Sequence, residues 1–155
     1  MTNSDLPSKR TLRLIIIFSL IIGAGIPLSF IHGWVKVSVI LSIIFTVFNM
    51  YCGFKGVESN HPAWFNRFLW AFFSVCLLIA SYAKLFEKHG LVQGEKVIHD
   101  FVASVYFSVV TFTTLGYGDL QPTKDVRLWA ASEALLGYTI MALIIALLIK
   151  YLSRL

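Results

Sequence analysis

The chain has 155 residues, of which 57% are hydrophobic and 14% are charged, and its mean hydropathy is +0.77. Soluble domains carry charge on roughly a quarter of their residues, so this composition is typical of a membrane protein. The net charge of +5 comes from scattered basic residues, which favours contact with anionic lipid headgroups and argues against nucleic acid binding.

Four apolar stretches are long enough to cross a bilayer, which takes about 20 helical residues. They cover about residues 12–31, 35–54, 68–86 and 128–151. The first stretch also resembles a secretory signal peptide, because Lys9, Arg10 and Arg13 precede it, but its length favours a retained helix. Only residues 32–34 separate the first two stretches, so we expect these two helices to form an antiparallel hairpin.

Two polar segments, residues 55–62 and 87–100, are predicted to be loops. The second contains His89 and His99, through which external pH could act, although solvated loop histidines are the simpler interpretation. None of the four stretches carries arginine at every third position, so we expect no voltage sensor. The sequence has no cluster with the spacing of a catalytic or metal site outside loops, so we expect neither an enzyme nor a bound cofactor.

The segment FVASVYFSVVTFTTLGYGDLQP, residues 101–122, is too short to cross the membrane before its Thr- and Gly-rich motif. Non-helical backbone survives at membrane depth only where protein or a water-filled cavity surrounds it. We therefore predict a short re-entrant helix over about residues 102–113, followed by a turn through residues 114–118. Glycines at alternate positions allow successive carbonyl oxygens to point to one side, and rings of such oxygens replace the hydration shell of a monovalent cation.

This segment resembles the selectivity filter of the tetrameric potassium channels, which reads T-x-G-Y-G-D after a Thr-rich pore helix. The matching residues are Thr111, Thr113, Thr114, Gly116, Tyr117, Gly118 and Asp119, and the resemblance covers about residues 63–155. It implies a filter formed by residues 114–118, with K⁺ held at Thr114, Leu115, Gly116 and Tyr117 and with Gly118 completing the segment. It also implies that four copies of the chain surround one pore, with both termini cytoplasmic.

The resemblance further assigns residues that support the filter, Thr111 and Thr113 among them. Leu115 stands where Val or Ile is commoner, but its backbone carbonyl can still contribute an oxygen ligand to the filter. Val110 replaces a glutamate that pairs with the motif aspartate in some bacterial relatives, so Asp119 needs another partner. Tyr106 occupies the position of a donor tryptophan, which predicts a hydrogen bond from Tyr106 to Asp119.

An ionisable residue, Glu133, lies about six residues into the last apolar stretch, where a charge is expensive. One hypothesis is that it supports the pore helix or the filter from behind; the alternative is that it reaches water or Arg127. By resemblance, Gly137 is the hinge of the inner helix. The expected lining of the cavity and gate is Tyr138, Met141, Ile145, Ala146 and Ile149, with packing against lipid or another helix as the alternative for each.

These expectations combine into an all-α membrane protein with two parts. Residues 1–62 would form a tail and a helical hairpin, and residues 63–155 the pore domain, with a re-entrant helix and filter between the third and fourth spans. The predicted function is passive, potassium-selective conduction by a homotetramer in the cell membrane, with K⁺ and lipids as partners. A weakly selective cation channel and a non-conducting subunit of a channel assembly are the alternatives.

Overall fold

The structure is a computed structural model that describes residues 34–58 and 64–153. The chain divides into two compact units, Met1–Ser74 and Val75–Leu155. The first predicted membrane span, residues 12–31, and the signal-peptide alternative for it lie outside the described residues.

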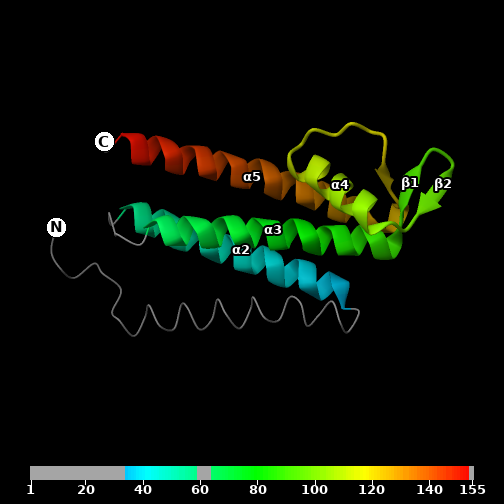
Figure 1. The fold of residues 1–155 in the computed structure, drawn as a ribbon, viewed down its shortest axis with the longest axis horizontal. Coiled ribbons are helices and arrows are strands. Elements are labelled where there is room, and N and C mark those ends of the chain that lie inside the picture. Colours follow the sequence, from blue (N-terminus) through cyan, green and yellow to red (C-terminus); the bar gives the residue numbers. More distant parts are fainter. Residues whose placement is uncertain (1–33, 59–63, 154–155) are drawn as a thin grey trace. The chain divides into compact units, whose positions relative to one another are not determined.

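The described part is mostly helical, as predicted. In chain order its elements are α2 (Val35–Glu58), α3 (Trp64–His89), β1 (Leu91–Gln93), β2 (Lys96–Ile98), α4 (Phe101–Phe112), β3 (Gln121–Pro122), the 3₁₀ helix η1 (Lys124–Val126) and α5 (Arg127–Leu152) (Figure 1). Helix α2 runs on to Glu58, into the segment expected to be the first polar loop.

Within the described ranges, two helical segments are long and apolar enough to cross a membrane: Leu69–His89 in α3 and Lys124–Ala146, which comprises η1 and most of α5. They correspond to the third and fourth predicted spans. The apolar stretch of α2, Val35–Tyr51, is shorter. Helix α4 has 12 residues, which is too short to span, because a crossing takes about 20.

Helix α2 buries four small polar side chains among apolar ones such as Val39 and Phe45, and it exposes several large apolar side chains. Its buried polar residues are Ser38, Ser42, Thr46 and Asn49, and its exposed apolar residues are Val37, Ile40, Ile44, Val47 and Tyr51. The Thr46 hydroxyl donates to the carbonyl oxygen of Ser74 in α3, at 3.0 Å. Apolar side chains on both the buried and the exposed side, with small polar residues at the contact, are typical of helices that pack within lipid.

A small antiparallel sheet corrects the expectation of an all-α chain with an open loop over residues 87–100. Helix α3 continues to His89, and the strands that follow pair in the order β2-β1-β3. Gly90, with a φ of +83°, ends the helix, and Gly94, with a φ of +61°, lies in the hairpin turn. Strands of two or three residues are too short to show an alternating pattern in the sequence. The pairing of β1 with β3 also joins segments that α4 and the glycine-rich segment separate in the chain.

The second unit has an aromatic core beside this hairpin sheet, which we define as β1–β3. Phe86 of α3 packs edge to face against Phe107 of α4, with 4.9 Å between the ring centroids. Tyr82 stacks on Phe86 with 6.1 Å between the ring centroids. Leu91 and Val126 are fully buried. Because α4 also packs against α5, the short helix is held on two sides and can position the segment that follows it.

Candidate functional site

The site begins with a well-defined N-terminus of α4. Asp100 has extended backbone angles, and its carboxylate accepts a hydrogen bond from the Ala103 amide at 2.7 Å. A capping aspartate satisfies one of the unpaired amides of the first turn. The helix therefore begins at Phe101, one residue before the predicted start.

The C-terminus of α4 is closed by the backbone of the residues that resemble the filter. The Thr114 amide donates to the Thr111 carbonyl and the Leu115 amide donates to the Val110 carbonyl, both at 3.0 Å. This pair of bonds is the Schellman motif, in which the residue after the cap is left-handed and is usually glycine. Here that residue is Thr114, with a φ of +58°.

Left-handed residues recur at every second position after the helix. Thr114, Gly116 and Gly118 have φ values of +58°, +56° and +79°, whereas Leu115 and Tyr117 lie outside this region. Alternating left- and right-handed residues turn successive carbonyl groups toward the same side of the chain, and glycine tolerates the left-handed positions best. The backbone of residues 114–118, which we call the filter segment, thus has the alternation that a row of carbonyl oxygens requires.

The filter segment lies on the surface of the single chain, where it arches between α4 and β3 (Figure 1). The side chains of Leu115 and Tyr117 are 57% and 67% exposed. Exposed large apolar side chains at a defined backbone mark a contact surface. The filter segment thus presents two large side chains on the surface of the described chain.

Asp119 follows the filter segment and interacts with Tyr106 of α4, the pair predicted from the sequence. The hydrogen bond to Asp119 raises the pKa of Tyr106 above its ordinary value of 10.0, and partial burial and the charge of Asp119 add to this shift. The supporting threonines lie at the end of α4. Thr113 donates its hydroxyl to the Val109 carbonyl at 2.8 Å, and Thr111 supplies the carbonyl that holds the Thr114 amide.

Gly137 of α5 lies directly against the end of α4. A Cβ atom built on Gly137 would be 1.8 Å from the Phe112 carbonyl oxygen and 2.7 Å from its carbonyl carbon. Only glycine allows backbones to approach this closely. The structure thus places Gly137 beside the base of the filter segment; its role as a hinge stays a prediction.

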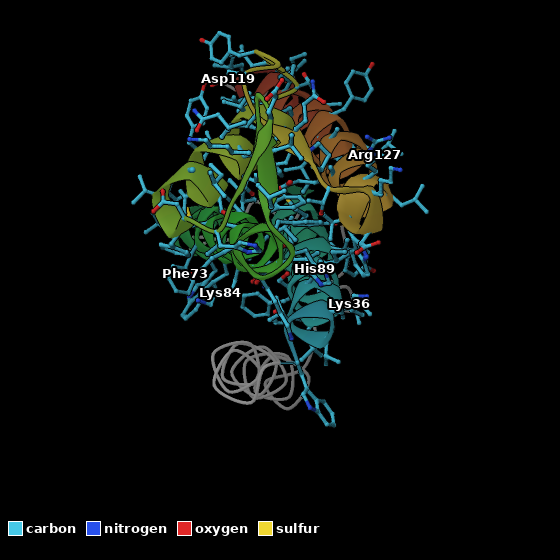
Figure 2. The ribbon with its side chains drawn as sticks, turned by 90° about the vertical axis from the view of Figure 1, so that its right-hand side faces the viewer. Lys36, Phe73, Lys84, His89, Asp119 and Arg127 are labelled. Carbon is cyan, nitrogen blue, oxygen red and sulfur yellow. The ribbon has the colours of Figure 1, made fainter. Side chains whose placement is uncertain are left out.

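Glu133 is fully buried, which contradicts the alternative that it reaches water or Arg127. Its Oε1 is hydrogen-bonded to the Ser108 hydroxyl of α4, and within the described ranges 34–58 and 64–153 its Oε2 has no partner. Arg127 points away from the body of the ribbon in Figure 2. Glu133 therefore contacts α4, the predicted pore helix, as the first hypothesis required, while its effect on the filter segment stays a prediction.

The five residues predicted to line a cavity share one feature, which is exposure on the surface of α5. They are Tyr138, Met141, Ile145, Ala146 and Ile149. Tyr138, Met141, Ile145 and Ile149 follow one another at three or four residues, which places them along one side of the helix, and Ala146 adjoins Ile145. Of the two loop histidines, His99 bonds the Glu87 carbonyl through Nδ1 at 2.9 Å, which fastens the hairpin sheet to the end of α3.

Sequence reasoning missed three polar residues around Glu133. Ser108 also lies 3.0 Å from the Ile79 carbonyl oxygen, and the Tyr82 hydroxyl lies 2.8 Å from that of Ser132. The signal was weak, because serine is common in apolar helices and its partners lie 25 to 50 positions away. Ser132 beside Glu133 and Ser108 within an apolar helix were the available hints.

Comparison with known proteins gives the family. The family described as "Ion channel" matches residues 71–154, which is more than half of the chain. This chain belongs to the ion channel family. The match covers most of α3, the hairpin sheet, α4, the filter segment and α5, and it confirms the family indicated by the filter motif.

Two curated relatives carry potassium channel names. The chain is 29% identical over 112 residues to the voltage-gated potassium channel Kch of Escherichia coli (strain K12), covering 72% of this chain and 26% of the relative. It is 36% identical over 76 residues to two pore potassium channel a of Oryza sativa subsp. japonica, covering 48% of this chain and 20% of the relative. The chain thus spans about a quarter of the first relative and a fifth of the second. No solved structure matches.

The channel family accounts for the chemistry of the site. Membership of the ion channel family and the two membrane-capable helices of the described ranges indicate a membrane protein. A row of backbone carbonyls binds cations without a charged side chain.

Proposed function

We propose that this channel conducts K⁺ selectively and passively as a homotetramer. The observation that carries the proposal is the alternation of left-handed residues at Thr114, Gly116 and Gly118. Four filter segments around an axis would present stacked rings of carbonyl oxygens, with the Thr114 hydroxyls as an additional ring. Both relatives are named as potassium channels, which supports this choice of ion.

The proposal includes the arrangement in the membrane. Helix α4 would enter from the outer side and return through the filter segment, placing the hairpin sheet outside and both termini in the cytoplasm of the cell. Together with the stretch at residues 12–31, helices α2, α3 and α5 would give four spans. Residues 1–62 would form the accompanying hairpin and residues 63–155 the pore domain.

The exposed side chains fit a fourfold assembly. Tyr117 is 67% exposed and would pack behind the filter against a neighbouring chain. Tyr138, Met141, Ile145, Ala146 and Ile149 would line the cavity below the filter. An apolar lining near the cytoplasmic end can close a pore by dewetting. Native mass spectrometry of the purified protein should give four chains per particle, and a monomer or dimer would contradict the assembly.

The decisive experiment is ion flux from liposomes that contain the purified protein. We expect K⁺ efflux that barium blocks, and a reversal potential that follows the K⁺ gradient in mixed K⁺ and Na⁺ solutions. A reversal potential midway between the two would favour the weakly selective channel. Absence of flux for both ions would favour a non-conducting subunit.

A pair of glycine variants separates a filter defect from general damage. Gly116→Ala and Gly94→Ala each place a methyl group at a left-handed residue, with φ of +56° and +61°, and neither meets an atom within 4 Å. Only Gly116 lies in the filter segment. We expect Gly116→Ala to reduce K⁺ flux at least tenfold and Gly94→Ala to leave it nearly unchanged; equal effects would contradict the assignment of the filter.

A further inference from the structure

Three helices of the second unit meet at one serine. Ser108 of α4 is fully buried, and its hydroxyl oxygen lies 3.0 Å from the Ile79 carbonyl oxygen of α3. The same oxygen is hydrogen-bonded to Oε1 of Glu133 in α5. Glu133 is also fully buried, and its second oxygen has no partner in the described residues.

The number of hydrogen atoms in this cluster is one too few if Glu133 is ionised. A serine hydroxyl has one hydrogen, whereas a carbonyl oxygen and a carboxylate oxygen can only accept. Ser108 would then have to share its hydrogen between two acceptors. A fully buried carboxylate that shares one hydrogen with a second acceptor, and has no basic partner among the described residues, is unfavourable. The desolvation of its charge is left uncompensated.

A neutral carboxylic acid removes both problems. Its O–H donates to the Ser108 oxygen, and the Ser108 hydrogen is then free for the Ile79 carbonyl. The remaining oxygen of Glu133 is an uncharged acceptor, whose burial costs much less than that of a charge.

In the neighbouring contact between Tyr82 and Ser132, each hydroxyl hydrogen has its own acceptor. The Ser132 hydroxyl donates to the Trp129 carbonyl of its own helix, at 2.7 Å. Tyr82 must therefore be the donor in its 2.8 Å contact with Ser132. Ser132 precedes Glu133 in α5, and Tyr82 lies one turn after Ile79 in α3, so α3 and α5 are fixed to each other beside the cluster.

We propose that Glu133, as a neutral acid, and Ser108 are positioning residues for the filter. The hydrogen-bond chain runs from the Glu133 carboxyl group through the Ser108 hydroxyl to the Ile79 carbonyl, and it fixes α4 against both flanking helices. Two residues after Ser108, the Val110 carbonyl accepts the Leu115 amide at 3.0 Å and the Gly116 amide at 3.4 Å. Through these two hydrogen bonds, the position of α4 determines the position of the filter segment.

The structural half of this proposal is testable without conduction. Infrared spectroscopy of the purified protein at neutral pH should show the carbonyl band of a protonated carboxylic acid, which ionised surface carboxylates do not give. The difference spectrum between the wild type and Glu133→Gln should assign this band to Glu133. If the band is missing, or if it persists in the variant, the neutral acid is wrong.

The functional half rests on the proposed potassium conduction and uses matched serine variants. Ser108→Ala breaks the hydrogen-bond chain, whereas Ser104→Ala removes another buried serine of α4, whose hydroxyl donates to the Asp100 carbonyl of the same helix end. Loss of a hydrogen bond that positions the filter should raise Na⁺ permeability relative to K⁺ by about fivefold in Ser108→Ala. Ser104→Ala should leave the ratio unchanged, and equal ratios would overturn the positioning role.

Glu133→Gln and Glu133→Ala give a second, independent comparison. The glutamine amide is neutral and can donate to Ser108, so this variant should keep the wild-type ion preference within about twofold, whereas alanine should lose it as Ser108→Ala does. If glutamine behaves as alanine does, the ionised form is needed and the proposal fails. A wild type that carries no K⁺ would refute the proposed function, while the infrared result would still decide the state of Glu133.

Discussion

Thr114 adopts a backbone conformation that threonine ordinarily avoids. Its φ of +58° costs a residue with a Cβ about 1–2 kcal/mol, and a β-branched residue there is a true outlier. The conformation is held because the Thr114 amide and its successor both bond carbonyl groups at the end of α4. Strain of this kind gathers at functional sites, where the surrounding structure fixes it.

The interaction of Tyr106 with Asp119 predicts a loss of support at alkaline pH. A raised pKa means that the folded protein favours the neutral phenol, so this contribution is fully present below the ordinary pKa of 10.0 and is lost as the pH rises through the higher pKa of the folded state. We expect K⁺ flux of the wild type to become less stable above pH 10, when Tyr106 ionises beside Asp119.

Titration of flux from pH 7 to 11 in the wild type and in Tyr106→Phe is the measurement. The variant has no phenol to ionise, so its flux should lack the alkaline step and should be less stable at neutral pH. An identical pH profile in both proteins would show that the interaction has no effect on the filter.

At Gly137, a single methyl group should disturb the end of α4. In Gly137→Ala the new Cβ would lie 1.8 Å from the Phe112 carbonyl oxygen, which belongs to backbone. Overpacking of this kind costs about 1–3 kcal/mol or more, so one helix must move and carry the filter segment with it. We expect K⁺ flux to fall about tenfold. Ala131→Ser, which adds one atom at an exposed position of the same helix, should have little effect.

Among the elements, the hairpin sheet ties the end of α3 to the exit of the filter segment. Strand β3 begins at Gln121, two residues after Asp119, and pairs with β1 through Leu91 and Val92. The Thr123 hydroxyl also donates to the His89 carbonyl at 3.3 Å. Because the filter segment is anchored by α4 at one end and by this sheet at the other, changes in the hairpin should reach the filter.

Two glycines of the hairpin allow a controlled test of this sheet. Gly90 and Gly94 are both left-handed, but a Cβ on Gly90 would lie 2.6 Å from Val97 Cγ1 and 2.9 Å from His99 Cε1, while Gly94 is open. Both alanine variants carry the conformational cost of about 1–2 kcal/mol, and only Gly90→Ala adds the clash. Hydrogen exchange should show faster exchange of the β1 and β2 amides in Gly90→Ala. Equal exchange in both variants would contradict the packing at Gly90.

For the whole molecule, the exposed filter segment means that ion binding and assembly should be linked. An ion held by four chains stabilises the tetramer over the separated chains by RT ln(1 + [K⁺]/Kd), about 2.7 kcal/mol at 100 times Kd. Replacing K⁺ by choline should therefore lower the temperature at which the tetramer dissociates. Gly116→Ala should abolish this dependence on K⁺, and a wild-type tetramer indifferent to K⁺ would argue against a shared filter.

The sequence determined the membrane class, the helices at the third and fourth spans, the short helix before the motif and the Tyr106–Asp119 pair. The class and the helices follow from composition and from runs of apolar residues, and the pair was implied by the resemblance to the potassium channels. Only the tertiary structure decided the hairpin sheet, the contact of Gly137 with Phe112, and the burial of Glu133 against Ser108. The pairing of β1 with β3 and the two helix contacts join residues far apart in the chain, and these pairings are set by how the helices pack.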